Sequence, residues 1–543
     1  MKKSSRYIAL ALCLVLCFAL FAGCNKTKDE GGAAAPPATD TSTPAAGAPS
    51  STKVTDTSAP PPAGAKFAEH LTFTNDNNPI ATLNPFNPAS GTTPTYWTMR
   101  MILDSLILLV NGEFLPNLAT SWETTDWKTF NIKLRDDAFF HNGEKFTAKD
   151  LEFTIVESRN GVGSQACDMW RPVETVNIIN DYEVQLILND VNVDFLFNMS
   201  MPSAGILNQK AYTEDAEKGY WIGTGAYKVV DFQTNNFVDL ERNDNYWGKA
   251  PYTKYITLKF IPEMSTRSIM MQNKETHVAF GISEADIAGF EASPDFNVIP
   301  TTFNNPNTLG FGMLHPITSD WNFRMAVMHA LNRPEIAVVA AGDWAAPEVT
   351  GTLWGYATQF RNNDIPLVEY NVEKAKEYLA KSPYNGEVLE LATAIITNVK
   401  ACEVIQQNLA AVGITVEVNE MDPPSLAAKA GYGKEDVELI MFVTGFNMSP
   451  SSFRNAYGPN GSYNRQTYDN PPLNEMIARV GTITDINERE KMYREMQEMV
   501  AADPPIVNVF WRLNGIVAQG NVGGLHLPPD VYYDLRYAYQ LID

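Results

Sequence analysis

Apolar side chains in the second half of the chain follow two different periods, and each period predicts an element. Residues 388–396 (VLELATAII) are mostly apolar, as in a buried strand. Residues 399–412 place apolar side chains such as Val404 and Leu409 on one face of a helix. Gly413 then fits the glycine that ends many helices. This part of the chain is therefore predicted to form a strand followed by a helix.

A second strand is predicted directly after that helix. Ile414, Val416 and Val418 alternate with polar residues. A strand, a helix and a strand in this order imply two parallel strands joined by a right-handed crossover. Residues 436–443 supply a further strand pattern, so we expect the second half to form an α/β lobe.

The first half of the chain has the pattern of a sheet-rich lobe. Apolar and polar residues alternate through residues 130–135, and His-Asn-Gly at 141–143 predicts a turn. Thr147 then begins a predicted helix, with Asp150 in a capping-box-like position three residues later. A sheet-rich lobe and an α/β lobe in one chain predict a cleft between them.

The first 23 residues are predicted to be a lipoprotein signal peptide. Three basic residues precede an unbroken apolar run of 14 residues, Ile8–Phe21, which suits a signal-peptide core and is too short to span a bilayer. Leu20–Cys24 (LFAGC) resembles the bacterial lipobox, in which the cysteine is acylated. Cys24 is therefore the expected lipidation site, and ordinary secretion with cleavage elsewhere is the alternative.

Residues 24–65 are predicted to form the lipidated cysteine and a disordered tether. Between residues 31 and 65, 31 of 35 residues are Gly, Ala, Pro, Ser or Thr. Such a segment cannot bury enough apolar surface to offset the entropy lost on ordering. No later segment is apolar enough to cross a membrane, so attachment would be through lipid only.

Charge and cysteine content exclude several classes of function. The formal net charge is −22, and removal of the leader leaves 38 basic and 63 acidic residues, a charge of −25. That surface repels nucleic acids and anionic lipids. Beyond Cys24 only Cys167 and Cys402 remain, so we expect no disulfide framework.

No motif points to catalysis or to a bound metal. The six histidines are scattered, with no H-E-x-x-H pair, and the chain has neither G-x-S-x-G nor a P-loop. We therefore expect no catalytic residue, no metal site and no cofactor, and predict that the protein is not an enzyme.

Several stretches, in order along the chain, resemble bacterial extracellular solute-binding proteins of family 5. They are residues 115–123 (LPNLATSWE), 134–144 (LRDDAFFHNGE), 147–151 (TAKDL), 223–227 (GTGAY), 241–247 (ERNDNYW), 323–333 (FRMAVMHALNR), 371–375 (NVEKA) and 406–413 (QQNLAAVG). Members of this family serve peptide- and nickel-type ABC importers. The resemblance spans the chain from about residue 73 to its end.

The resemblance implies an α/β fold of the two-lobe periplasmic-binding-protein type, in the large class with an extra subdomain and a hinged cleft. Lobe I would comprise residues 66–308 and 506–543, with an inserted subdomain at about 111–219. Lobe II would comprise residues 309–505. Closure of the lobes on a ligand would present the closed form to ABC permease subunits in the membrane.

Candidate ligand contacts come from the turn after the strand that ends at Val443, because ligands of α/β sheets bind beyond the carboxyl ends of strands. Two other loops add Asn84 and Trp354. The full set of candidates is Asn84, Trp354, Gly445, Phe446, Asn447, Phe453, Arg454 and Tyr457. Each aromatic could equally be packing, and Arg454 could be a solvated surface group or could hold a carboxylate.

The ligand class is left open between a peptide and an oligosaccharide. In peptide-binding members the corresponding turn carries an aspartate for the α-ammonium group, whereas this chain has no Asp or Glu from residue 439 to 468. Aromatic and amide side chains also suit a neutral sugar.

We therefore expect an extracytoplasmic solute-binding lipoprotein of an ABC importer. It would capture a peptide or related small organic solute as a monomer, lipid-anchored outside the cytoplasmic membrane of a bacterial cell. The alternatives are an oligosaccharide-binding member of the same family, a lipid-tethered secreted hydrolase, and a binding protein that feeds a sensor or adhesion system.

Overall fold

The computed structural model describes residues 60–542, except 76–79, 111, 160–163, 303–304, 356–357, 435–436, 446–448 and 528–532. The predicted leader and tether, with Cys24, lie outside this part of the chain. Among the helices described, none combines the length and the apolar character needed to cross a bilayer.

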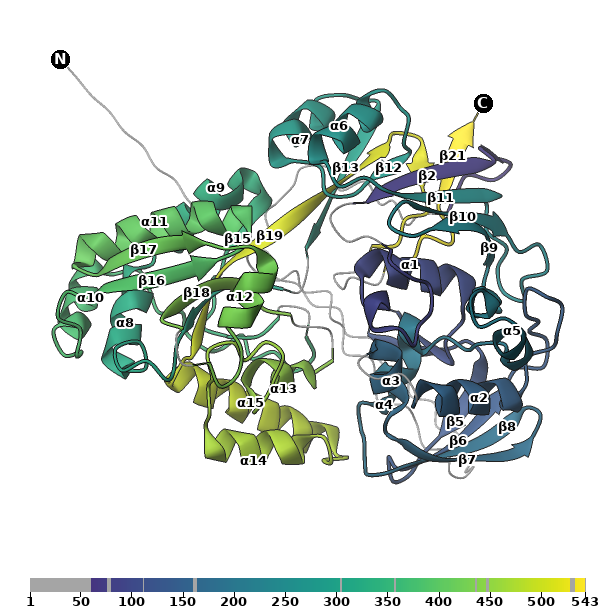
Figure 1. Ribbon diagram of the computed structural model, residues 1–543, viewed down its shortest axis with the longest axis horizontal. Coiled ribbons are helices and arrows are strands. Elements are labelled where there is room, and N and C mark those ends of the chain that lie inside the picture. The colour runs from purple at the N-terminus through teal and green to yellow at the C-terminus, as the bar shows by residue number, and fades with distance from the viewer. Residues whose placement is uncertain are drawn as a thin grey trace, which may run out of the picture. The chain divides into compact units, whose positions relative to one another are not determined.

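The largest sheet of the described chain has twelve strands, in the order β17-β16-β18-β14-β19-β12-β2-β11-β10-β9, with β13 and β15 also paired to β19 (Figure 1). The strands are β2 (His70–Asn75), β9 (Tyr227–Gln233), β10 (Phe237–Arg242), β11 (Tyr255–Phe260), β12 (Val278–Ala279), β13 (Phe296–Thr302), β14 (Asn307–Phe311), β15 (Ala345–Pro347), β16 (Val388–Thr393), β17 (Thr415–Glu420), β18 (Leu439–Val443) and β19 (Ile506–Gln519). We call the side of this sheet from β12 to β9 the first lobe, and the side from β14 to β17 the second lobe.

Smaller sheets accompany the first lobe. They have the orders β5-β6-β8-β7, β3-β4 and β1-β21-β20. Their strands are β1 (Lys66–Phe67), β3 (Ile107–Val110), β4 (Glu113–Pro116), β5 (Ala119–Glu123), β6 (Thr129–Leu134), β7 (Val173–Asn180), β8 (Glu183–Leu188), β20 (Val522–Gly523) and β21 (Tyr539–Ile542). Residues from β5 to β8 close a hydrophobic core of their own around Phe130 and Trp170.

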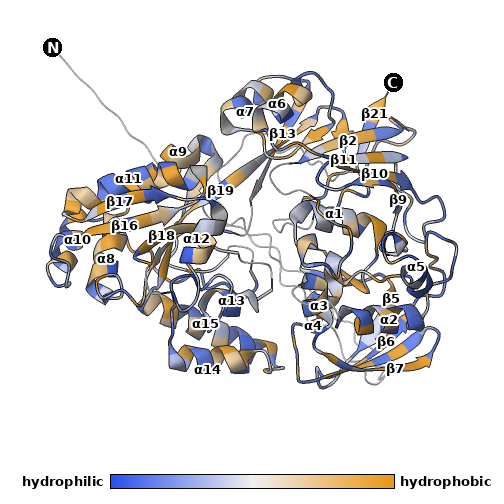
Figure 2. Cartoon of the chain, viewed as in Figure 1, coloured by the Kyte–Doolittle hydropathy of each residue, from blue (hydrophilic) through white to orange (hydrophobic). Residues whose placement is uncertain are grey.

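Helices flank the sheets of both lobes. In the first lobe they are α1 (Thr93–Ile102), α2 (Ala148–Ser158), α3 (Gln165–Trp170), α4 (Phe195–Ser200), α5 (Gln209–Glu214), α6 (Met264–Gln272) and α7 (Glu284–Glu291). In the second they are α8 (Trp321–Ala330), α9 (Arg333–Ala341), α10 (Val372–Leu379), α11 (Ile396–Val412), α12 (Pro423–Lys429), α13 (Ser452–Tyr457), α14 (Pro471–Val480) and α15 (Ile486–Ala502). Single 3₁₀ turns are η1 (Pro88–Ser90), η2 (Pro202–Ala204), η3 (Gly219–Trp221) and η4 (Gly342–Trp344). Many of these helices carry both hydrophobic and hydrophilic residues, as expected where one face packs on a core (Figure 2).

The strand, helix and strand predicted in the second half are present. β16 and β17 are parallel, with Leu391 beside Val418, and α11 connects them. Gly413 has a φ of 98°, the left-handed conformation that ends helices. The predicted boundaries were less accurate. β16 ends at Thr393 and α11 begins at Ile396, because apolar residues at the end of a strand and at the start of a helix look alike in sequence.

The capping box predicted at the start of α2 is also present. The Asp150 carboxylate accepts a hydrogen bond from the Thr147 backbone N–H at 3.0 Å. This reciprocal arrangement satisfies amide groups that the first turn of a helix leaves unpaired.

A buried charge network ties the end of α1 to the C-terminal segment. The guanidinium of Arg536 donates to both carboxylate oxygens of Asp534, at 2.9 and 2.7 Å. It also lies 3.7 Å from the Asp104 carboxylate, and all three side chains are buried. Asp104 accepts further hydrogen bonds from Thr224 and Trp247, at 3.0 Å each. Burial raises the pKa of Asp104, and Arg536 opposes that effect.

Replacement of Arg536 by methionine should strongly destabilise the protein. The variant removes the guanidinium that opposes the burial of Asp104 and is the main charge partner of Asp534. Breaking a buried ion pair in this way typically costs about 3–5 kcal/mol. Chemical denaturation at pH 7 measures the difference in unfolding free energy. As a control, Lys381→Met, which breaks an exposed ion pair with Glu377, should leave that free energy nearly unchanged. A loss below about 1 kcal/mol for Arg536→Met would show that the network is not a structural requirement.

Candidate functional site

The register of β19 shows which edge of the second lobe faces the first lobe. Asn307 pairs with Phe510, the last β19 residue that contacts β14. Asn307 also pairs with Val443, the last residue of β18. Because β16 runs parallel to β18, the carboxyl ends of both strands lie where β19 leaves the second lobe (Figure 1).

The first lobe presents the same kind of edge. β2 and β12 are parallel, with Thr74 beside Ala279, the last residue of β12. β12 is antiparallel to β19, with Ala279 beside Val517, so the carboxyl ends of β2 and β12 point along β19 toward the second lobe. Both carboxyl edges therefore border β19 between residues 510 and 517. Carboxyl edges are where α/β sheets bind ligands.

Unpaired polar groups lie at the carboxyl end of β2. Thr74 and Asn75 are buried, and neither the Thr74 hydroxyl nor the Asn75 side-chain amide has a hydrogen-bond partner among the described residues. Their backbone carbonyls are paired, with Phe280 at 2.9 Å and Ile261 at 3.3 Å. A buried polar group without a partner costs about 1–3 kcal/mol. Such groups are rare in native proteins, and a ligand that supplies the missing partners is one explanation.

Three stacked aromatic rings lie next to this edge. Trp97 of α1 is 5.1 Å from Tyr533 with the ring planes 20° apart, and 4.5 Å from Phe280. Phe280 directly follows β12, and the Tyr533 hydroxyl lies 3.3 Å from the Thr301 hydroxyl on β13. All three rings are buried, so they form a rigid apolar support behind the end of β2.

Polar side chains at the edge of the second lobe are linked to one another. Thr444, directly after β18, donates to Thr308 at 3.0 Å, and Thr308 donates to Asn508 at 3.2 Å. Asn508 in turn donates to the Thr352 carbonyl at 3.2 Å. This network joins β18, β14 and β19 and fixes their ends relative to one another.

Gly445 follows Thr444 at this edge. A Cβ atom at Gly445 would lie 2.2 Å from the ring of Tyr463, so a larger residue would require that ring to move. The predicted contacts Phe446 and Asn447 lie outside the described residues. Ligand contact by Gly445 stays a prediction.

The predicted aromatic contacts lie in a hydrophobic core. Trp354, Phe453 and Tyr457 are all buried, and Trp354 lies 5.0 Å from Phe453 and 5.2 Å from Tyr493. The Tyr457 hydroxyl donates to the Leu353 carbonyl. Packing was the alternative interpretation for these aromatics, and it describes what they do in this structure. The Trp354 indole N–H has no partner among the described residues, so ligand contact by these side chains stays a prediction.

The remaining two predicted contacts are polar. Arg454, in α13, is exposed to solvent. Asn84 is partly buried, and its side-chain oxygen accepts a hydrogen bond from the Phe86 backbone N–H at 3.0 Å. Among the described residues, no hydrogen bond connects the side chain of Arg454 or Asn84 to the two carboxyl edges. Ligand contact by these two residues also stays a prediction.

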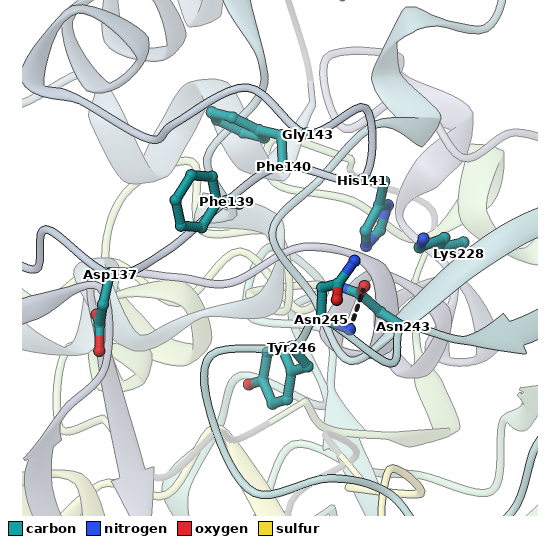
Figure 3. Close-up of a pocket in the computed structure, with 9 residues that line it drawn as sticks. All are labelled: Asp137, Phe139, Phe140, His141, Gly143, Lys228, Asn243, Asn245 and Tyr246. Atoms are coloured by element: carbon teal, nitrogen blue, oxygen red, sulfur yellow. Dashed lines mark hydrogen bonds between the residues drawn. The ribbon is translucent and has the colours of Figure 1, made fainter.

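A pocket of about 520 Å³ lies entirely within the first lobe (Figure 3). Its lining residues are Asp137, Phe139, Phe140, His141, Gly143, Lys228, Asn243, Asn245 and Tyr246. The two most buried polar groups are already paired with the Gly225 carbonyl, His141 at 3.0 Å and Asn243 at 3.1 Å. Burial lowers the pKa of His141 to about 4, so its ring is neutral at pH 7. The walls of the pocket join the β5–β8 region to β9 and β10.

Groups of three or more potential metal ligands are absent from the described residues. The described chain therefore supplies no cluster of His, Cys, Asp and Glu side chains to which a metal-dependent activity can be assigned.

The two lobes also touch away from β19. The Val193 backbone N–H, just before α4, donates to the Gly481 carbonyl between α14 and α15 at 3.4 Å. The next residue, Asp194, interacts electrostatically with Arg489 of α15. Burial raises the pKa of Asp194 to about 6, and Arg489 opposes that effect.

Comparison with known proteins identifies the family. The model of bacterial extracellular solute-binding proteins, family 5, matches residues 113–464. The chain belongs to this family. Family 5 proteins bind solutes outside the cytoplasm, and the resemblance found in the sequence is confirmed.

Two curated family 5 relatives align over most of the chain. The glutathione-binding protein GsiB of Pectobacterium atrosepticum is 25% identical over 455 residues, which cover 78% of this chain and 85% of the relative. The dipeptide-binding protein of Escherichia coli is 24% identical over 494 residues, which cover 81% and 88%.

A solved structure confirms the predicted fold class. The ABC transporter substrate-binding protein CtaP of Listeria monocytogenes aligns with a TM-score of 0.79 at 21% identity, over 88% of this chain and all of CtaP. The family 5 chain therefore has the two-lobe α/β fold predicted from its sequence.

Protonation of Asp194 should stabilise the folded protein. Folding raises the pKa of Asp194. Its contribution to the free energy of unfolding is therefore most favourable below about pH 4 and is lost as the pH rises through about 6. Urea denaturation of the wild type and of Asp194→Asn between pH 4 and 8 tests this. The stability of the wild type relative to the variant should fall by about 1–3 kcal/mol as the pH rises.

The exposed neighbour Asp190 provides the matched control for this experiment. The variant Asp190→Asn should follow the pH profile of the wild type. Parallel profiles for the wild type and Asp194→Asn would contradict a pKa of Asp194 raised by burial.

Proposed function

We propose that this protein is the membrane-anchored receptor of an ABC importer, and that it captures a peptide or related small organic solute between the carboxyl edges of its two lobes. The observation that carries the proposal is the register of β19, because it places both carboxyl edges along the same stretch of one strand. The buried, unpaired side chains of Thr74 and Asn75 support it. Two relatives named for binding glutathione and a dipeptide support the ligand class.

Capture would work by a shift between open and closed arrangements of the lobes. β19 and the β13–β14 segment are the two connections that cross between the lobe sheets in the described chain. A ligand that contacts both edges stabilises only the closed arrangement, and therefore increases its population. The hydrogen bond from Val193 to Gly481 and the electrostatic interaction of Asp194 with Arg489 of α15 would then form part of the closed state.

The neutral oligosaccharide remains the second candidate for the cargo. The stacked rings of Trp97, Phe280 and Tyr533, with the amide of Asn75, are side-chain types that also suit sugars. Their complete burial favours a supporting role over direct stacking on a sugar ring.

Native mass spectrometry of the protein as purified tests the proposed function. We expect a one-to-one complex with a small organic molecule, which calorimetry with dipeptides, glutathione and a neutral oligosaccharide then assigns to a class. The bound compound should be recovered unchanged after incubation. Conversion of the compound to a product would support the hydrolase alternative, and the absence of binding to every compound would overturn the proposal.

Lipid attachment at Cys24 has its own test. Cys24→Ser removes the acylated thiol, so the variant should leave the membrane fraction, because the chain described contains no helix that could hold it there. Cell fractionation with immunoblotting measures the distribution. Cys17→Ser, within the same leader, is the matched control and should stay with the membrane. Unchanged membrane attachment of Cys24→Ser would contradict lipid anchoring.

A further inference from the structure

The N-terminus of α11 lies at the carboxyl edge of the second lobe and has no side-chain cap. The 17-residue helix begins at Ile396, three residues after β16 ends at Thr393. Its N-cap is Ile395, which carries no hydrogen-bonding side chain, and no acidic residue occurs in the first turn. The first backbone hydrogen bond of the helix joins the Val399 N–H to the Ile395 carbonyl, at 2.9 Å. The N–H groups before Val399 therefore have no partner within the helix.

Asn398 is the third residue of this helix, and its side-chain amide is unpaired. The residue is completely buried, and neither Nδ2 nor Oδ1 has a hydrogen-bond partner among the described residues. A side chain at this position normally folds back toward the open end of the helix, as the acidic member of a capping box does. Nearby Thr393 does not pair with it, because its hydroxyl donates to the Met441 carbonyl at 3.1 Å.

The electrostatic surroundings of this helix end favour a negative charge. A helix N-terminus carries about half a positive charge. No Asp or Glu occurs in residues 391–402, or in residues 439–468 that follow from the neighbouring strand β18. Arg465 is partly buried and lies 5.7 Å from the ring of Phe442 on β18, and its Nε has no hydrogen-bond partner among the described residues. Two acids follow from the other neighbouring strand, Glu420 beside Thr393 and Asp422 just beyond it, and both are exposed to solvent.

We propose that the N-terminus of α11, together with Asn398, binds a carboxylate group of the cargo. The proposal rests on the receptor function above and narrows its ligand class to solutes that carry an anionic group. The backbone N–H groups of the first turn and the Asn398 Nδ2 group would donate to the carboxylate oxygens. Oδ1 of Asn398 would accept from a neighbouring N–H of the solute. Charge-assisted bonds of this kind are the strong ones, and they would satisfy a buried amide that is otherwise unpaired.

The proposal also predicts the orientation of the bound cargo. A solute with one carboxylate would place that end on the second lobe, because the unpaired groups at the first-lobe edge, Thr74 and Asn75, are neutral. A neutral oligosaccharide would leave the α11 terminus without an anion.

Isothermal calorimetry with four probes tests the inference: glutathione, a dipeptide with a free C-terminal carboxylate, the same dipeptide amidated at its C-terminus, and a neutral oligosaccharide. We expect the wild type to bind a free carboxylate at least about 10-fold more tightly than the amidated form, the range expected for a hydrogen bond to a charged group. Equal affinity for the free and amidated dipeptides, or binding of the neutral oligosaccharide alone, would overturn the inference and leave the receptor function standing. Failure of the wild type to bind any probe would overturn both.

Asn398→Asp is the decisive variant. It keeps the size of the side chain, and the open N–H groups of the first turn offset part of the cost of burying the new charge. Thermal denaturation of the ligand-free variant checks that it is folded. Its charge should repel the ligand and weaken binding of the free carboxylate about 100-fold, with little effect on the amidated dipeptide. Asn385→Asp adds the same charge at an exposed residue before β16, at the opposite edge of the sheet, and should leave Kd unchanged. Unaltered affinity of Asn398→Asp for the free carboxylate would overturn the inference.

Discussion

The pairing of β19 is the constraint on which the arrangement of both lobes depends. A single strand of 14 residues pairs with β14 in the second lobe and with β13 and β12 in the first. Because its hydrogen bonds fix the register in both lobes at once, the carboxyl edges of the two sheets are held along the same few residues. A slip of one residue in either lobe would turn each side chain of β19 to the opposite face of the sheet. The position of the binding region thus follows from strand register before any ligand contact is considered.

Elements with a strong local signal were predictable from the sequence. The helix at 399–412, its terminal Gly413 and the two strands beside it follow from the periodicity of apolar residues, and Thr147 with Asp150 follows from capping chemistry. Boundaries were less accurate, since Ile395 and Ile396 are equally suited to a strand and to a helix. The pairing of β19 with strands about 200 positions earlier in the chain could not be predicted, because contacts between distant segments produce no periodic pattern in a single sequence.

The candidate site was only partly predictable for a related reason. Reasoning from the sequence predicted the site after the strand that ends at Val443, and β18 does end there, but ligand binding at that edge stays a prediction. The same reasoning favoured aromatic residues such as Trp354 and Phe453, which the structure buries in a core. Aromatic side chains serve packing and binding equally well, so their type alone does not separate the two roles. Asn75 and Asn398 were missed. The signal that marks them is burial without a hydrogen-bond partner, which becomes visible only when the surrounding atoms are placed.

The Arg536 network has a consequence for the order in which the chain can fold. Asp104 lies before the second lobe in the sequence, whereas Arg536, 3.7 Å away in the structure, lies after that lobe and after β19. The ion pair between them can therefore form only when the whole of the second lobe has already been synthesised. Until then the Asp104 carboxylate lacks the guanidinium that opposes the effect of its burial. We therefore expect the core around α1 to become fully stable only once the segments of both lobes are present.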